Sequence, residues 1–219
     1  MAWVIYILSS IITIIILIFL FYHLWFLRKP HRNIPSKGIV SPADGKIIKI
    51  LSIDGSSAII KKHPVGKIKA FTKDVAKKCW VIVIVMTPLN VHFQRAPADA
   101  RVLKVRYMEG RLLNAVLGSD QLEATVENEK NEILMQTEYG RMKVIQIAGL
   151  VAKRIVCFAG KNQNIKKGQE IGLIKFGSQV CLVVPRSRGL KLKVEEGEKV
   201  VDGETVIAVP ARSRRPETE

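Results

Sequence analysis

The residues with the most distinctive chemistry form a Gly177-Ser178 step, about four-fifths of the way along the chain. As an ordinary feature the step is a turn, because glycine and serine are common turn residues. In the alternative interpretation, it is a peptide bond that the protein cleaves in its own chain. The hydroxyl of Ser178 can attack the carbonyl of Gly177, which has no side chain to hinder the approach. The rest of the chain decides between these two interpretations.

Two further residues have the chemistry of an active site. His92 follows the turn Thr87-Pro88-Leu89-Asn90, and imidazole exchanges protons near neutral pH. Asp44 lies in Pro42-Ala43-Asp44-Gly45, and this segment recurs 55 residues later as Pro97-Ala98-Asp99-Ala100. The alternatives are a structural histidine and a turn-forming aspartate. We expect one of the two aspartates to face a site and the other to form a turn.

The cysteines predict neither a metal site nor a disulfide. Cys79, Cys157 and Cys181 are far apart and form no C-x-x-C pair. We therefore expect buried thiols in a reduced compartment. His23, His31 and His63 are assigned no catalytic role.

The elements that must position these residues are predicted to be β strands. Short runs rich in Ile and Val are separated by Gly, Pro, Asp and Asn. Between Arg111 and Gln121 the pattern allows a short helix or a loop. The predicted strands are Ile47–Leu51, Ala58–Ile60, Val81–Met86, Val102–Tyr107, Met142–Ile147, Ile155–Phe158, Val180–Val184 and Val206–Val209.

Two repeats indicate internal symmetry. Residues 165–171 and 200–206 share the pattern apolar-x-x-Gly-x-x-apolar, which predicts a strand, a tight glycine turn and a strand. Together with the repeated Pro-Ala-Asp segment, this predicts a mainly β, barrel-sandwich-like domain with an internal pseudo-repeat.

An N-terminal transmembrane helix is expected before this domain. Ala2 to Leu27 contains no Lys, Arg, Asp or Glu and exceeds the roughly 20 residues that cross a bilayer. No basic residue precedes it and no small-x-small cleavage site follows it, so a signal peptide fits less well. Arg28, Lys29 and Arg32 follow at once, which places the body on the cytoplasmic side of the cell membrane. Residues 1–33 form the anchor with its basic flank, and residues 34–219 form the catalytic domain.

The net charge of +16 predicts an anionic partner. The anchor favours an anionic membrane surface. Nucleic acid is not expected as a partner, because no Lys- and Arg-rich run carries interleaved aromatic residues.

Four segments in order resemble the phosphatidylserine decarboxylase family, over roughly residues 34–209. Each segment alone is weak, but the order is specific. The short body with one anchor is most similar to the compact branch that includes archaeal archaetidylserine decarboxylases. The segments are Ser41-Pro42-Ala43-Asp44-Gly45-Lys46, Val91-His92-Phe93-Gln94-Arg95-Ala96-Pro97, Glu127-Asn128-Glu129 and Phe176-Gly177-Ser178.

The resemblance implies a self-processing enzyme. The chain would break between Gly177 and Ser178 into a β chain, residues 1–177, and an α chain, residues 178–219, which stay together as a heterodimer. Ser178 would become a covalent pyruvoyl group, with no metal and no pyridoxal phosphate. This group would form a Schiff base with the serine headgroup of a membrane phospholipid, phosphatidylserine or archaetidylserine, and accept the electrons left by CO2. The product is the ethanolamine lipid.

The resemblance also implies roles for three side chains. His92 is the acid or base, and Asp44 orients a histidine or helps to activate Ser178. Longer family members carry H-x-x-H, where this chain has Arg95 in the second position, so the base for self-cleavage is left open. Arg95 either binds the carboxylate or phosphate of the substrate or forms a surface salt bridge.

Three other functions compete with this one. A biotinyl- or lipoyl-type carrier needs a modifiable lysine at a hairpin tip. Met142-Lys143 is the only Met-Lys pair, but it opens a predicted strand. A β-rich peptidase would need two or three metal ligands at fixed spacing. A decarboxylase relative that is not processed would act only as a membrane scaffold.

Overall fold

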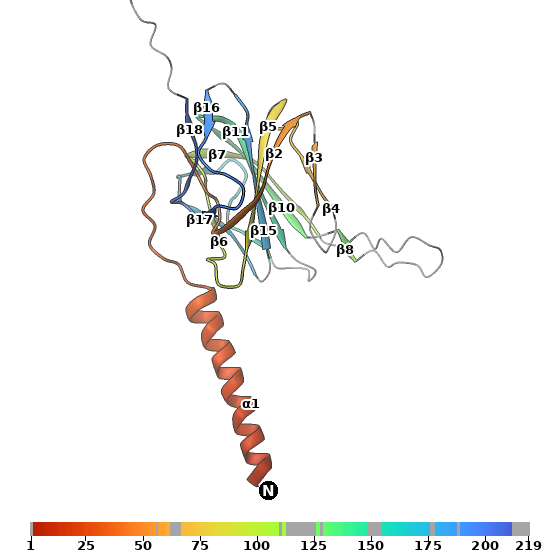
Figure 1. Ribbon diagram of the computed structural model, residues 1–219, viewed down its shortest axis with the longest axis vertical. Helices are drawn as coiled ribbons and strands as arrows, with labels where there is room; N and C mark the ends of the chain where they lie inside the picture. The colour runs from red at the N-terminus through yellow and green to blue at the C-terminus, as the bar shows by residue number, and fades with distance from the viewer. Residues whose placement is uncertain are drawn as a thin grey trace, which may run out of the picture.

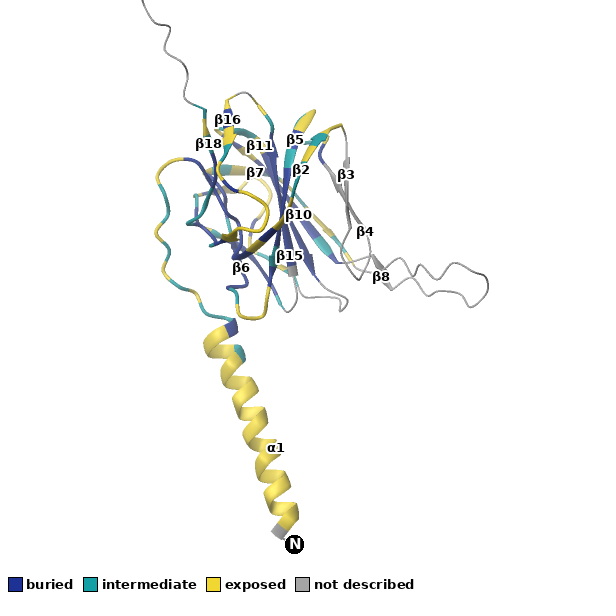
Figure 2. Ribbon diagram, viewed as in Figure 1, coloured by how far each residue is buried: buried dark blue, intermediate teal, exposed yellow. Residues whose placement is uncertain are grey.

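A computed structural model shows a long N-terminal helix that leads into a β body (Figure 1). The structure describes residues 2–55, 57–61, 67–109, 111–112, 126–127, 129–148, 155–175, 178–187 and 189–211. The α helix α1 (Ala2–Leu20) continues into a π-helical segment, η1 (Phe21–Phe26). Residues Trp3–Phe26 are long and apolar enough to cross a membrane, and Figure 2 shows that nearly all of this helix is exposed.

The body consists of eighteen described strands. They are β1 (Ile39–Val40), β2 (Gly45–Asp54), β3 (Ser57–Lys61), β4 (Lys67–Phe71), β5 (Lys78–Met86), β6 (Phe93–Arg95), β7 (Ala100–Met108), β8 (Arg111–Leu112), β9 (Val126–Glu127), β10 (Lys130–Thr137), β11 (Gly140–Ala148), β12 (Ile155–Cys157), β13 (Asn164–Ile165), β14 (Glu170–Ile174), β15 (Ser178–Pro185), β16 (Leu190–Leu192), β17 (Lys199–Val200) and β18 (Val206–Pro210).

A curled antiparallel sheet of eight strands, in the order β13-β7-β10-β11-β15-β5-β2-β17, forms the centre of the body. Two small sheets, β1-β18-β16 and β12-β14-β6, pack against this sheet. Their apolar side chains and those of the central strands together form the larger of two main core clusters. A smaller cluster includes Val81, Val83 and Cys181. The side chains alternate along β15, because successive residues of a strand point to opposite faces. The dark central strands of Figure 2 mark this two-sided burial.

The predicted strands are confirmed, with boundaries that differ by a few residues. The prediction for Arg111 to Gln121 is wrong at its start, because Arg111 and Leu112 form strand β8 paired with β9. The remainder of that segment lies outside the described residues. Strand β10 is absent from the prediction although it lies in the middle of the main sheet.

The two Pro-Ala-Asp segments lie side by side, which confirms the internal pseudo-repeat. The amide of Val40 donates to the carbonyl of Pro97 at 2.9 Å, and the amide of Arg95 donates to the carbonyl of Pro42 at 2.9 Å. Adding 55 to Val40 gives Arg95, and adding 55 to Pro42 gives Pro97, so the two contacts are equivalent. The body therefore has an approximate two-fold arrangement here.

The two glycine turns, at Gly168 and Gly203, each form a backbone hydrogen bond to the residue before one Pro-Ala-Asp segment. The amide of Gly168 donates to the carbonyl of Ala96 and the amide of Gly203 donates to that of Ser41, at 2.9 and 2.8 Å. Both glycines have positive φ, 80° and 75°. Ile34 packs against both: an added Cβ would lie 2.5 Å from its Cδ1 at Gly168 and 2.8 Å at Gly203. A strand precedes and follows each turn, but these flanking strands pair with other strands, so neither turn closes a hairpin.

Candidate active site

Ser178 is the first residue of β15, in the middle of the main sheet. Its backbone lies opposite Met86 at the end of β5 and opposite Ala148 at the end of β11. Both neighbours belong to the larger apolar core. Gly177, and with it the predicted cleavage bond, lies outside the described residues.

His92 lies in the loop between β5 and β6. Its carbonyl accepts a hydrogen bond from the amide of Ile174 at 3.2 Å. Ile174 ends β14, four residues before Ser178, so at most about 14 Å of extended chain separates the two. Met86, which faces Ser178, comes six residues before His92. The histidine loop and the predicted cleavage segment therefore converge.

The imidazole of His92 is fully buried and stacks on the ring of Phe26, with the ring centroids 3.8 Å apart. Neither ring nitrogen makes a hydrogen bond of good geometry. Burial lowers the pKa of His92 to about 4; the nearby backbone of Asn90 and the carboxylate of Asp44 oppose this change, and Arg28 reinforces it. His92 is therefore a neutral imidazole at physiological pH.

Asp44 positions the histidine loop through the backbone. Its Oδ2 accepts a hydrogen bond from the amide of Val91 at 3.0 Å, next to His92. Its Oδ1 accepts hydrogen bonds from Arg32 at 3.1 Å and from the amide of Asp202 at 3.0 Å. Among the described side chains, Asp44 makes no hydrogen bond to the imidazole ring of His92. The carboxylate thus fixes the loop and leaves the ring unbonded.

The other aspartate of the repeat has the simpler role. Asp99 accepts a hydrogen bond from the amide of Lys167 at 2.8 Å, the equivalent of the bond between Asp44 and the amide of Asp202. Asp99 therefore has the turn contact expected of one of the two aspartates, and the site role of Asp44 stays a prediction. Asp44 differs because it also holds the loop that carries His92.

Asp202 is a buried carboxylate that the sequence analysis did not identify. It contacts Arg32, and it accepts a hydrogen bond from Nε of Arg95 at 2.7 Å. Burial raises its pKa to about 6, and the neighbouring carboxylate of Asp44 acts in the same direction, whereas Arg32 opposes it. In the sequence, Asp202 occupies the same position of the glycine-turn repeat as Lys167, and this position predicts only a turn residue.

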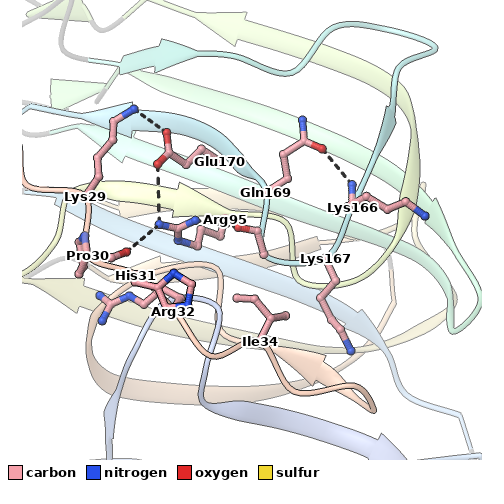
Figure 3. Close-up of a pocket in the computed structure, with 11 residues that line it drawn as sticks. Lys29, Pro30, His31, Arg32, Ile34, Arg95, Lys166, Lys167, Gln169 and Glu170 are labelled. Atoms are coloured by element: carbon pink, nitrogen blue, oxygen red, sulfur yellow. Dashed lines mark hydrogen bonds and ion pairs between the residues drawn. The ribbon is translucent and has the colours of Figure 1, made fainter.

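Arg95 lines an open pocket of about 610 Å³ between the linker after the anchor and the Gly168 turn (Figure 3). Its Nη1 donates to the carbonyl of Gly168 at 2.9 Å, and its Nη2 lies 3.7 Å from Glu170. Lys29 binds the same carboxylate at 2.8 Å. The guanidinium is mostly buried, so the salt bridge is not a surface one.

A chain of buried amides borders the site and was also missed. Asn131 donates to Gln146 at 2.8 Å, and Gln146 donates to Gln94 at 2.7 Å. Gln94 in turn donates to the carbonyl of His92 at 2.7 Å. Gly172 makes room for the Gln146 amide, because the Cβ of any other residue would overlap with it. The chain ties the centre of the main sheet to the histidine loop.

The lysine considered for a carrier function cannot serve that function. Lys143 lies inside strand β11 and is fully buried. Its Nζ lies 2.7 Å from Asp74 and 3.4 Å from Glu132. A modifiable lysine needs an exposed hairpin tip, so the carrier interpretation is wrong.

The three cysteines are thiols. Cys79 and Cys181 are buried as expected, and burial raises the pKa of the Cys79 thiol. Cys157 is only partly buried, since the short strand β12 lies at the edge of its sheet.

Comparison with known proteins shows which family the chain belongs to. A family model described as phosphatidylserine decarboxylase matches residues 19–208. The chain belongs to the phosphatidylserine decarboxylase family. This is a family of carboxy-lyases, so the expected enzyme class is confirmed.

Individual relatives in this family agree with the match. The chain is 38% identical to the phosphatidylserine decarboxylase proenzyme of Chlorobaculum tepidum over 191 residues, which cover 86% of this chain and 78% of that one. It is 38% identical to the proenzyme of Syntrophus aciditrophicus, with 84% and 77% covered. It is 36% identical to the proenzyme of Wolbachia pipientis wMel, with 84% and 74% covered.

Proposed function

We propose that this chain is a proenzyme that cleaves itself between Gly177 and Ser178 and then decarboxylates phosphatidylserine through a Schiff base. The convergence of the buried His92 loop with the start of β15, in a member of this family, carries the proposal. The products of cleavage are residues 1–177 and 178–219, which remain together as a heterodimer. The products of catalysis are CO2 and the ethanolamine lipid.

The residues around Ser178 fit a pyruvoyl group made from that serine. Met86 and Ala148, opposite it in the sheet, are buried and apolar, so water is largely excluded at this end of β15. The amide chain through Gln146 provides polar groups at its edge. The pyruvoyl carbonyl would condense with the substrate amine and accept the electron pair left by CO2.

His92 and Asp44 perform the proton chemistry and the positioning in this proposal. A neutral imidazole can accept the Ser178 hydroxyl proton during self-cleavage and can exchange a proton with the substrate later. Both ring nitrogens remain available, because neither is used in a hydrogen bond of good geometry. Asp44 keeps the loop in place by holding the amide of Val91. The neutrality of His92 makes it our candidate for the base that starts the cleavage.

Arg95 is our candidate for binding the anionic part of the substrate. Three of its contacts fix the side chain, whereas its contact with Glu170 is long, at 3.7 Å. A phosphate oxygen can take the place of that carboxylate at Nη2, since guanidinium binds oxyanions with paired donors. Lys166 and Lys167 line the same pocket and add positive charge.

The anchor and the charge place the enzyme at its substrate. An anchored body carrying a net charge of +16 is attracted to anionic phospholipids. The basic residues Arg28, Lys29 and Arg32 directly after the helix support a catalytic domain on the cytoplasmic face of the cell membrane.

The experiment is to purify the protein in detergent and determine the masses of its chains. We expect two fragments, the smaller with a blocked N-terminus that borohydride traps together with an amine. Ser178→Ala should stay uncut. A wild-type protein that remains one chain of full mass would contradict the proposal and favour an unprocessed membrane scaffold. Assays with phosphatidylserine and archaetidylserine then determine which lipid is decarboxylated.

A further inference from the structure

The last residue of the anchor is packed into the candidate site. Among the anchor residues whose side chains the structure describes, Phe26 alone is buried. Its ring stacks on the imidazole of His92 with a centroid distance of 3.8 Å and an interplanar angle of 28°. A helix that only tethers the body would have no need to bury its final side chain against a buried histidine.

The residues that follow Phe26 hold the same loop at several points. Leu27 packs against the cluster of Val91, Phe93 and Leu173. Val91 and Phe93 are the two neighbours of His92 in sequence. Arg28 donates from Nη2 to the carbonyl of Leu89 at 2.7 Å. The ammonium group of Lys29 lies 4.4 Å from the centroid of the Phe93 ring.

The helix changes its winding where it makes this contact. Residues Phe21–Phe26 are π-helical, and the amide of Leu27 still donates to the carbonyl of Tyr22 at 3.1 Å. π-helical turns are rare and frequently occur at functional sites. The wider turn ends at Phe26, the residue that contacts His92.

The contact determines how much water reaches His92. The imidazole is fully buried, and both its nitrogens lack hydrogen bonds of good geometry. Buried polar groups without partners are exceptional in folded proteins and often serve in catalysis. The groups that face the ring are the Phe26 ring and the Arg28 guanidinium from the anchor side, the Asn90 backbone from its own loop, and the Asp44 carboxylate from the start of β2.

We propose that Phe26 is a positioning residue for His92, which seats the imidazole and shields it from water, so that the anchor completes the catalytic site. This inference rests on the role of His92 in the proposed function. The contact keeps the imidazole neutral, because burial is the main reason for the lowered pKa of His92. Removal of the aromatic ring would admit water and bring the pKa back toward the ordinary value of 6.5.

The test compares the pH dependence of decarboxylation in Phe26→Ala and in the wild type, in phosphatidylserine vesicles. The neutral imidazole is the active form, so a higher pKa loses activity on the acid side first. We expect Phe26→Ala to lose about tenfold near pH 5.5 and little near pH 8. Phe26→Leu keeps an apolar cover and should retain the wild-type profile. Leu24→Ala, at an exposed position of the same helix, is the matched control.

A further variant separates hydration from the effect of a cavity. Phe26→Gln leaves a smaller cavity than Phe26→Ala but presents a polar group, so its acid limb should also move to higher pH. Acid limbs of Phe26→Ala and Phe26→Gln that superimpose on the wild type would overturn the proposal.

Titration of the His92 ring by NMR gives a readout that needs no activity. The wild-type ring should titrate well below 6.5, and the His92 signal is assigned by its loss in His92→Gln. A wild-type His92 that titrates near 6.5 overturns the inference about Phe26, even where the variants fail to fold. Absence of decarboxylation in wild-type protein whose His92 titrates low would instead overturn the proposed function.

Discussion

At the scale of residues, the site depends on what surrounds one histidine. His92 gets its loop position from Asp44 and its burial from Phe26. Neither contact uses a ring nitrogen for a hydrogen bond, so the imidazole stays available for reactants. An unpaired buried imidazole costs stability, on the order of 1–3 kcal/mol. The fold carries this cost at the place where a proton acceptor is needed.

We expect His92→Gln to lower decarboxylation at least about 100-fold, because general acid-base catalysis contributes 10²–10⁴-fold. The measurement is CO2 release from labelled phosphatidylserine, with processing followed by fragment mass. His23→Gln, at an exposed position of the N-terminal helix, should stay near the wild-type rate. A folded His92→Gln variant that works within twofold of the wild type would remove His92 from the mechanism.

The sequence identifies His92 and Asp44 but misses their partners for definite reasons. Phe26 belongs to a long apolar helix, where one aromatic residue looks like any other. Asp202 stands next to a turn glycine, where aspartate is common. Only the fold shows that it is buried between Arg32 and Arg95. Contacts between residues so distant in sequence leave no local pattern.

At the scale of elements, two glycine turns and one isoleucine fix the approach of the linker to the body. Ile34 lies against both Gly168 and Gly203, and each turn pairs with a Pro-Ala-Asp segment. The segment after the anchor is thus held at the approximate two-fold arrangement. The repeats in the sequence predicted the turns and the symmetry, but not the side chain between them.

Replacement of Gly168 by alanine should lower the free energy of unfolding by about 1–3 kcal/mol, since both the positive φ and the contact with Ile34 are unfavourable for a Cβ. Denaturant unfolding in detergent measures the change. Gly197→Ala is the control, because its φ is also positive, at 92°, but nothing lies within 4 Å.

The double variant Ile34→Ala with Gly168→Ala should recover part of the loss, as expected for residues in contact. Equal effects of Gly168→Ala and Gly197→Ala would show that Ile34 does not constrain the turn.

Strand β10 shows where periodicity fails as a signal. It lies between β7 and β11, yet Asn131 and Glu132 at its start leave an apolar run of only Ile133 to Met135. Both are buried because Gln146 and Lys143 on the neighbouring strand bind them. In the sequence, two adjacent polar residues are typical of a loop. Their partners on the neighbouring strand are known only from the strand register, which depends on the whole sheet.

At the scale of the whole molecule, the proposed cleavage divides a sheet rather than a linker. Strand β15 would belong to the small chain, and both its neighbours, β5 and β11, would belong to the large one. Strands β17 and β18 also pair with strands of the large chain. The interface between the two chains is therefore the core of the domain.

The two chains should elute together from gel filtration in mild detergent, at the volume of uncut Ser178→Ala. They should separate only in denaturant, because separation exposes the strands on both sides of β15. Mass analysis of the eluted peak provides the check. Elution of the small chain by itself without denaturant would contradict this interface.

The central position of β15 also affects how the cleaved enzyme would lose its activity irreversibly. An intact chain that unfolds can refold by itself, whereas two separated chains must first find each other, so recovery becomes dependent on concentration. In the proposed processing, the bond before Ser178 is not remade after it is cut, so each molecule would mature only once. The working lifetime of the enzyme is then set by the rate of its first complete unfolding rather than by its equilibrium stability.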